Sequence, residues 1–186
     1  HFMLKEIPEQ PKVIRDTINS AVKDGKIDFS GIGLTDEEMQ KISQIYIVAC
    51  GSAYHVGMAV QYVIEDLTSI PVRVALASEF RYRKMSLVKD SLVIIISQSG
   101  ETADSLAALR EAQNKGIKTL GIVNVVGSSI AREADNVFYT LAGPEISVAT
   151  TKAYSTQLIA GYLLALRFAV ARNEMTEEKC SEMLAE

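Results

Sequence analysis

Short apolar runs of strand length recur along the chain and are separated by segments with helical periodicity. Runs that do not alternate with polar residues are typical of strands buried on both faces. Apolar residues at helical spacing lie between them, as in residues 56–67 and at Leu106, Leu109 and Ala112. This alternation predicts an α/β domain, with a parallel sheet covered by helices on both faces. The expected strands are residues 45–50, 72–76, 92–96, 117–123 and 136–141.

Further helices flank this pattern. Pro11 suits the first turn of an amphipathic helix, and Gly25 suits its end. Thr35, with Glu38 three residues later, has the pattern of a capping box at another helix start. Other helices are expected over residues 129–134, from about 151 to 171, and from Thr176 onward.

The flanks and the alternating region together indicate three parts. We expect an N-terminal helical extension over residues 1–43, one α/β domain over residues 44–172, and a C-terminal helix over residues 173–186. A chain of 186 residues is long enough to bury such a core without disulfides or a structural metal. Because the first residue is His1 and not Met, we expect the chain to be a piece of something longer.

Composition excludes several classes of function. The net charge of −4 and the absence of a broad basic region argue against nucleic-acid binding. Cys50 and Cys180 cannot build a disulfide framework and lack metal-ligand spacing, so no metal is expected and a reducing, cytoplasmic setting fits best. The apolar stretch 158–171 is interrupted by Arg167 and is too short to span a bilayer, so we expect no membrane partner.

In a parallel sheet, ligands bind beyond the carboxyl ends of the strands. The segment Ser97–Thr102 follows the third expected strand and leads into a helix, so its hydroxyls and N–H groups could hold a phosphate. The charge of Glu101 counts against an anion, and an ordinary serine-rich turn is the competing interpretation. Gly51 and Gly57 lack dinucleotide-binding spacing and no P-loop occurs, so no nucleotide cofactor is expected.

Three other side chains are weaker candidates. Cys50 ends the first expected strand and could be a nucleophile, although a small core residue is the simpler interpretation. His55 could do acid–base work or could pack against its own helix. Lys152 opens a long helix, where a cation opposes the helix dipole, so an acidic partner or ligand is expected beside it.

The stretch Ser97-Gln98-Ser99-Gly100-Glu101-Thr102-Ala103-Asp104 resembles the signature of the sugar isomerase (SIS) domain family. Residues 1–11, 78–83 and 142–153 resemble, more narrowly, the isomerase part of the glutamine–fructose-6-phosphate aminotransferases. These enzymes make glucosamine 6-phosphate from fructose 6-phosphate and glutamine-derived ammonia. The resemblance implies a flavodoxin-like, three-layer αβα sandwich with a five-stranded parallel sheet and helical flanks.

The resemblance also assigns residues to a substrate site. It implies a phosphate-binding loop and a set of sugar contacts, with Ala53 standing where relatives carry a hydroxyl. It implies no catalytic residue in this chain, because the family's acid–base groups lie in a second SIS half. The implied phosphate-binding residues are Ser97, Gln98, Ser99 and Thr102, and the implied sugar contacts are Ser52, Ala53, Val148 and Thr150.

The implied partners are a phosphorylated hexose such as fructose 6-phosphate or glucosamine 6-phosphate, a glutaminase domain and second SIS half in the parent chain, and a second copy in a homodimer. An alternative is a non-catalytic sugar-phosphate-sensing SIS module of a regulator. A basic DNA-binding helix would favour that alternative, and residues 1–43 contain none. An interaction domain without a ligand is a third interpretation.

Overall fold

The computed structural model describes residues 1–84 and 87–185 and is built around a parallel sheet of five strands. The strand order is β4-β3-β5-β6-β7, which is the flavodoxin-like order 2-1-3-4-5 among these five. The predicted fold class is therefore confirmed, and every expected strand forms. The strands are β3 (Gln44–Ala49), β4 (Val72–Leu76), β5 (Ser91–Ser97), β6 (Lys118–Val123) and β7 (Asn136–Tyr139).

The two central strands explain the uninterrupted apolar runs. Every residue of β3 and of β5 is buried, because helices cover both faces of the sheet. From β3 the chain moves outward to β4 and then returns to pair β5 on the other side of β3. The direction of winding therefore reverses between β3 and β5, which is the place where open α/β sheets form ligand crevices.

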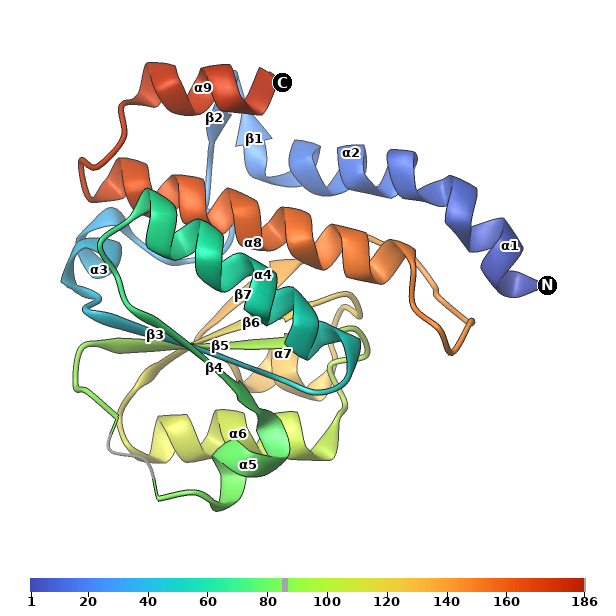
Figure 1. Ribbon diagram of the computed structural model, residues 1–186, viewed down its shortest axis with the longest axis horizontal. Coiled ribbons are helices and arrows are strands. Elements are labelled where there is room, and N and C mark those ends of the chain that lie inside the picture. Colours follow the sequence, from blue (N-terminus) through green and yellow to red (C-terminus); the bar gives the residue numbers. More distant parts are fainter. Residues whose placement is uncertain (85–86, 186) are drawn as a thin grey trace.

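Helices form a layer on each side of the sheet (Figure 1). On one side α4 and α8 lie against the sheet, with α2 packed on α8, and on the other side lie α5 and α6. The predicted helices are present, whereas the short α5 was not predicted. These elements are α2 (Gln10–Ala21), α4 (Ser52–Leu67), α5 (Ala77–Tyr82), α6 (Ala103–Asn114), α7 (Ser129–Glu133) and α8 (Lys152–Ala171).

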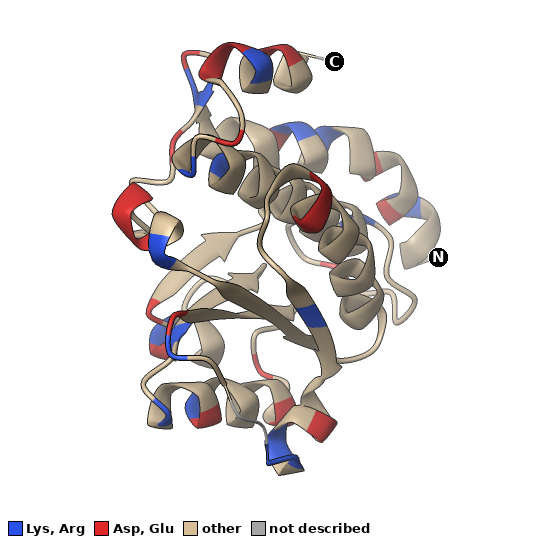
Figure 2. Cartoon of the chain, turned by 60° about the vertical axis from the view of Figure 1, so that its left-hand side comes forward, with Lys and Arg blue, Asp and Glu red and all other residues tan. Residues whose placement is uncertain are grey.

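The sheet divides the hydrophobic core into two clusters. The larger cluster joins the α4 and α8 side to the N-terminal segment and to Cys180, whereas the smaller one fills the space under α5 and α6. Charged residues lie mainly on the helices and loops and are sparse on the strands (Figure 2). This distribution follows from a sheet that is covered on both faces.

The N-terminal segment differs from its prediction. Helical structure begins earlier, with α1 (Phe2–Glu6) and the 3₁₀ turn Ile7–Glu9. The helix that was expected to stop at Gly25 ends at Ala21, so this prediction was wrong. Asp24 and Gly25, with φ of 50° and 74°, instead turn a small hairpin, because a two-residue Asp-Gly turn matches strand twist. The hairpin strands are β1 (Val22–Lys23) and β2 (Lys26–Ile27).

The other flanking predictions are matched more closely. Thr35 and Glu38 form the expected capping box at α3 (Asp36–Lys41). The C-terminal helix α9 runs over Glu177–Ala185, and Glu186 lies outside the described residues. Among residues 1–84 and 87–185, every helix falls short of the length and apolarity that a membrane crossing requires.

Candidate functional site

A cavity of about 220 Å³ opens at the carboxyl ends of β3 and β5, where the winding of the sheet reverses. Its walls come from the start of α4, the loop between β5 and α6, the loop before α8, and α8 itself. All eight residues that the resemblance implies for the substrate site line this one cavity, although their contacts with a ligand stay a prediction. They are Ser52, Ala53, Ser97, Gln98, Ser99, Thr102, Val148 and Thr150.

The loop Ser97–Thr102 is shaped by its own hydroxyl groups. The Ser97 hydroxyl oxygen accepts the N–H of Gly100 at 3.0 Å and lies 3.3 Å from the Thr102 hydroxyl. The Ser99 hydroxyl oxygen accepts the N–H of Glu101 at 3.2 Å. Because backbone N–H groups occupy the serine oxygens as acceptors, the serine O–H groups remain available as donors. The loop therefore offers neutral donors at the start of α6, which suits an anion.

Gly100 gives this loop its close approach to the neighbouring turn. Its φ is +67°, a left-handed conformation that favours glycine. A methyl group at this position would lie 2.1 Å from the Ser128 hydroxyl oxygen, which is closer than any real contact. Its carbonyl also accepts the N–H of Ile130 at 3.0 Å, so the loop is fastened to α7.

Glu101 does not point its charge at the loop. Its carboxylate accepts both the N–H and the hydroxyl of Ser129, each at 2.7 Å, and so caps the start of α7. These hydrogen bonds from Ser129 lower the pKa of the Glu101 carboxyl from its ordinary value. The objection that the Glu101 charge would repel an anion is weakened, because this carboxylate serves the neighbouring helix.

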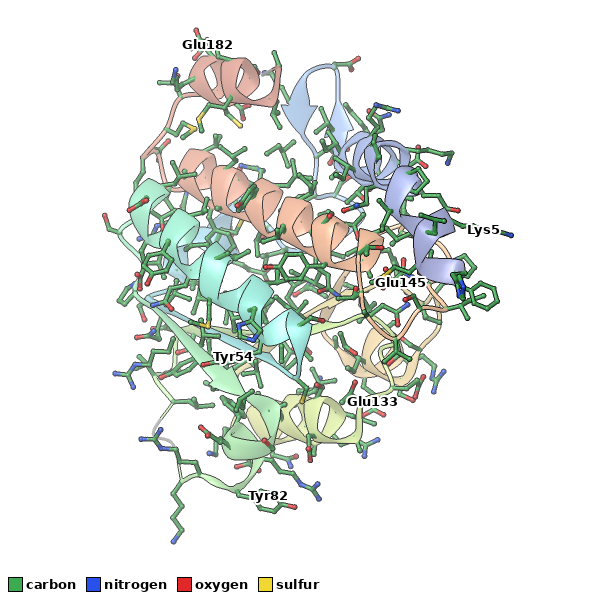
Figure 3. The ribbon with its side chains drawn as sticks, turned by 45° about the vertical axis from the view of Figure 1, so that its right-hand side comes forward. Lys5, Tyr54, Tyr82, Glu133, Glu145 and Glu182 are labelled. Carbon is green, nitrogen blue, oxygen red and sulfur yellow. The ribbon has the colours of Figure 1, made fainter. Side chains whose placement is uncertain are left out.

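The loop before α8 forms the opposite wall and is organised by Glu145 (Figure 3). Its carboxylate accepts the Thr150 hydroxyl at 2.7 Å and the N–H groups of Thr151 and Ala153 at 2.8 and 3.3 Å. The hydroxyl proton of Thr150 is therefore directed to Glu145, which leaves the Thr150 oxygen as an acceptor. Val148 is fully exposed and forms part of the rim.

The N-terminal segment holds this loop and the first turns of α8 in place. The buried Glu6 carboxylate accepts the N–H of Ile146 at 2.7 Å, and Gln10 accepts the Ser155 hydroxyl at 2.6 Å. The expected acidic partner of Lys152 is Glu9, 2.5 Å away, and the Lys152 side chain is only 4% exposed. Lys152 is thus satisfied by an ion pair and does not face the cavity.

The cavity contains one charged side chain among the described residues that line it, and that side chain is Glu145. Carboxylates of the chain itself occupy the start of α7, through Glu101, and of α8, through Glu145. The start of α6 has no such cap from its N-cap residue, Thr102. An anion in this cavity would accordingly meet hydroxyls and helix N–H groups at α6.

Sequence reasoning missed several residues of the cavity wall. Glu145 and Ser147 enter it through the segment before α8, and Gln157 enters it from the second turn of α8, which no local spacing reveals. Ser105 lies in the first turn of α6 and could have been found by helical periodicity.

Of the weaker candidates, Cys50 lies in the cavity wall and His55 does not. Cys50 lines the cavity, but its thiol contacts the Ser105 hydroxyl, 3.9 Å away, and no general base among the described residues forms a hydrogen bond with it. His55 is exposed, makes an edge-to-face contact with the Tyr54 ring and lies outside the cavity wall. No group of three potential metal ligands occurs within residues 1–84 and 87–185.

Comparison with known proteins supports this description. The chain is 58% identical, over its whole length, to a glutamine–fructose-6-phosphate aminotransferase (isomerizing) of Clostridium tetani, and 55% identical to that of Clostridium acetobutylicum. It covers 31% of each of these relatives, so it spans about a third of their length. These relatives are aminotransferases, which favours the enzyme interpretation over the regulator.

A solved structure and a family pattern agree with these relatives. The C-terminal domain of glucosamine-fructose-6-phosphate aminotransferase from Francisella tularensis superposes with a TM-score of 0.95 at 42% identity. The match covers the whole of this chain and 52% of that one. The pattern of the SIS domain matches residues 38–167, which include the sheet and the cavity. The chain belongs to the SIS domain family.

Proposed function

We propose that this chain holds the phosphorylated sugar in an enzyme that makes glucosamine 6-phosphate from fructose 6-phosphate and glutamine-derived ammonia. The observation that carries the proposal is the convergence of Ser97–Thr102, the start of α4 and the loop before α8 on one cavity. In the proposed complex, Ser97, Gln98, Ser99 and Thr102 bind the phosphate. The similarity to glutamine–fructose-6-phosphate aminotransferases supports the choice of sugar.

The proposed sugar contacts lie across the cavity from the phosphate loop. Ser52 and Thr150 supply hydroxyl oxygens, and Val148 closes the rim. Ala53 has no hydroxyl, so its contribution would come from its backbone or from close packing.

The same proposal covers the organisation of the parent enzyme. Residues 1–43 form the extension, residues 44–172 the SIS domain, and residues 173–186 lead to a second SIS half. The coverage of 31% of the relatives supports a larger parent chain that includes a glutaminase domain. We further propose a homodimer that works in the cytoplasm in amino sugar biosynthesis.

The cavity favours positioning over catalysis. Opening a sugar ring and moving a proton between neighbouring carbons requires general acid–base groups within reach. The described residues that line the cavity include neither His nor Lys, and the Glu145 carboxylate is occupied by Thr150, Thr151 and Ala153. The chain alone therefore binds without turning the sugar over, and detectable turnover by the purified chain would contradict this.

Thermal unfolding with and without ligand tests the proposal. Glucose 6-phosphate at about 100 times its Kd should add roughly 2.7 kcal/mol of stability, which is on the order of 5–10 °C for a chain of this size. Ser99→Ala should abolish the shift, and free glucose should give none. Ser69→Ala, at an exposed position far along the chain from the cavity wall, should keep it. The absence of a shift in the unmutated chain at millimolar ligand would overturn the proposal.

A further inference from the structure

One buried glutamine of the cavity wall has no hydrogen-bond partner for its side chain among the described residues. Gln157 lies in the second turn of α8, is 3% exposed and lines the cavity. Its amide makes no hydrogen bond to any of the described residues, 1–84 and 87–185. The Gln157 amide atoms are not among the fully buried polar atoms that lack a partner in the described part of the chain, so the amide faces the open space of the cavity, where a ligand can reach it.

Gln44 provides the comparison within the same chain. It is also a buried glutamine, 8% exposed, but its amide donates to the carbonyl of Pro71 at 2.8 Å. The neighbour of Gln157, Thr156, is likewise satisfied, because its hydroxyl donates to the carbonyl of Ala153 at 3.0 Å. Gln44 and Thr156 are thus paired within the fold, whereas the Gln157 amide borders the empty space of the cavity.

The position of Gln157 separates it from the phosphate loop. It comes from α8, on one side of the sheet, whereas Ser97–Thr102 leads into α6 on the other side (Figure 1). The cavity joins the two across the edge of the sheet. A ligand whose anionic end lies at the start of α6 would therefore extend its remaining part toward α8.

The chemistry of an amide favours a hydroxyl over an anion as the partner. An amide has an acceptor oxygen and a donor nitrogen, and a hydroxyl group can donate to the first and accept from the second. A phosphate oxygen would pair the nitrogen and leave the amide oxygen unsatisfied. We propose that Gln157 is a specificity-determining residue, whose amide binds a hydroxyl group on the sugar part of the ligand. This inference rests on the proposed function, because it assumes a sugar phosphate in the cavity.

The proposal makes opposite predictions for stability and for binding. Gln157→Leu keeps the approximate size of the side chain and removes the unpaired amide. Without ligand, the variant should melt at the same or a higher temperature than the unmutated chain, because the lost amide makes no hydrogen bond within the described part of the chain. Its affinity for glucose 6-phosphate should fall at least about tenfold. A merely structural glutamine would instead show a lower melting temperature.

Isothermal titration of the 186-residue chain separates the possible outcomes. Inorganic phosphate, which lacks the sugar, should bind Gln157→Leu and the unmutated chain equally, within about twofold. Gln61→Leu is the control, because that glutamine donates to the Val72 carbonyl and lies outside the cavity wall. Gln157→Asn keeps the amide but shortens its reach, and it should also lose affinity for the sugar phosphate.

Failure of this inference can be told apart from failure of the proposed function. If the unmutated chain binds no sugar phosphate, the proposed function fails, and this inference fails with it. If the unmutated chain binds, Ser99→Ala does not, and both Gln157 variants bind glucose 6-phosphate as before, only this inference is overturned. A loss of inorganic phosphate binding in Gln157→Leu would also overturn it, because the residue would then act on the anion.

Discussion

Gly161 on α8 lies directly against Val60 on α4: a methyl group at Gly161 would come within 2.2 Å of a Val60 methyl carbon. At this point the Val60 side chain therefore packs directly on the backbone of α8, and no side chain of α8 lies between the two helices. This approach brings α8 against the sheet and, with it, Gln157 into the cavity wall.

Gly161→Ala should destabilise the chain by about 1–3 kcal/mol, because the added methyl forces α4 and α8 apart. Val60→Ala alone should also destabilise it, through the space it leaves. The double variant should lose less unfolding free energy than the two single variants lose together, since alanine at position 60 leaves room for the methyl group at position 161. Urea denaturation measures all three, and Gly31→Ala, where the added methyl meets nothing within 4 Å, is the control. If the loss in the double variant equalled the sum of the two single losses, a direct contact between Gly161 and Val60 would be contradicted.

Gly100 and Gly116 have similar backbone conformations but different surroundings, so they can be compared directly. Their φ values are +67° and +70°, so an alanine at either position loses about 1–2 kcal/mol to its backbone conformation. Only at Gly100 does the methyl also meet a neighbour, the Ser128 hydroxyl. Gly100→Ala should be the more destabilising and should abolish sugar-phosphate binding, whereas Gly116→Ala should keep it.

A rescue identifies the cause of the Gly100 effect. Ser128→Gly in the Gly100→Ala background removes the clash and should recover part of the stability. Calorimetric unfolding and titration with glucose 6-phosphate measure the two effects. Equal losses in the two alanine variants would show that the contact with Ser128 does not matter.

The parts that the sequence predicted well are those fixed by local chemistry. Burial on both faces makes β3 and β5 continuous apolar runs, and capping chemistry marks Thr35 as the start of α3. The hairpin at Asp24–Gly25 was missed, because its two strands have two residues each and carry no readable alternation. Helix α5 was missed because six residues are too few for a helical pattern.

In the candidate site, too, the residues fixed by local sequence could be predicted and those placed by tertiary packing could not. Ser97–Thr102 could be found because a strand end, small hydroxyls and a helix start are adjacent in sequence. Glu145 and Gln157 could not, because Glu145 lies in a loop that Glu6 holds from 140 residues away, and Gln157 enters the cavity wall through the packing of α8 against α4. Contacts of that kind come from tertiary packing, and a single sequence carries no periodic sign of them.

The Glu101–Ser129 hydrogen bonds predict a dependence on pH. The folded state lowers the pKa of Glu101, so its contribution to stability is complete above the unfolded value and is lost as the pH falls through the folded one. The difference in urea midpoint between the unmutated chain and Glu101→Gln should therefore shrink as the pH drops from 6 to below 4.5. Ser129→Ala, which removes one donor, should raise the pKa of Glu101 in an NMR titration. A midpoint difference that does not change with pH would contradict this account.

The Lys152–Glu9 pair should matter more than an exposed pair. Glu9→Gln leaves a nearly buried ammonium group without its counter-charge and should destabilise the chain by about 1–2 kcal/mol, a value reduced because Glu9 is itself 47% exposed. Asp16→Asn breaks the exposed Lys12–Asp16 pair in the same segment and should have an effect of about 0.5 kcal/mol or less. Chemical denaturation of both variants gives the comparison. Equal effects would mean that burial of Lys152 does not raise the importance of its partner.

The two cysteines provide a probe of the cavity that needs no assumption about catalysis. Cys50 is partly exposed and lines the cavity, whereas Cys180 is 2% exposed. Burial raises the pKa of the Cys180 thiol, so little of its reactive thiolate forms at neutral pH. Iodoacetamide at pH 7.5 should therefore label one site, Cys50, and mass spectrometry of the digested chain identifies it.

Ligand protection completes this test. Glucose 6-phosphate should slow the labelling of Cys50, because a sugar phosphate in the cavity covers the thiol, and free glucose should not. In Ser99→Ala the protection should disappear while the basal labelling rate stays the same, since the substitution removes a phosphate donor and does not touch the thiol. Cys50→Ala should abolish labelling altogether. Unchanged labelling of Cys50 at a ligand concentration that saturates the titration would mean that the sugar phosphate binds outside this cavity.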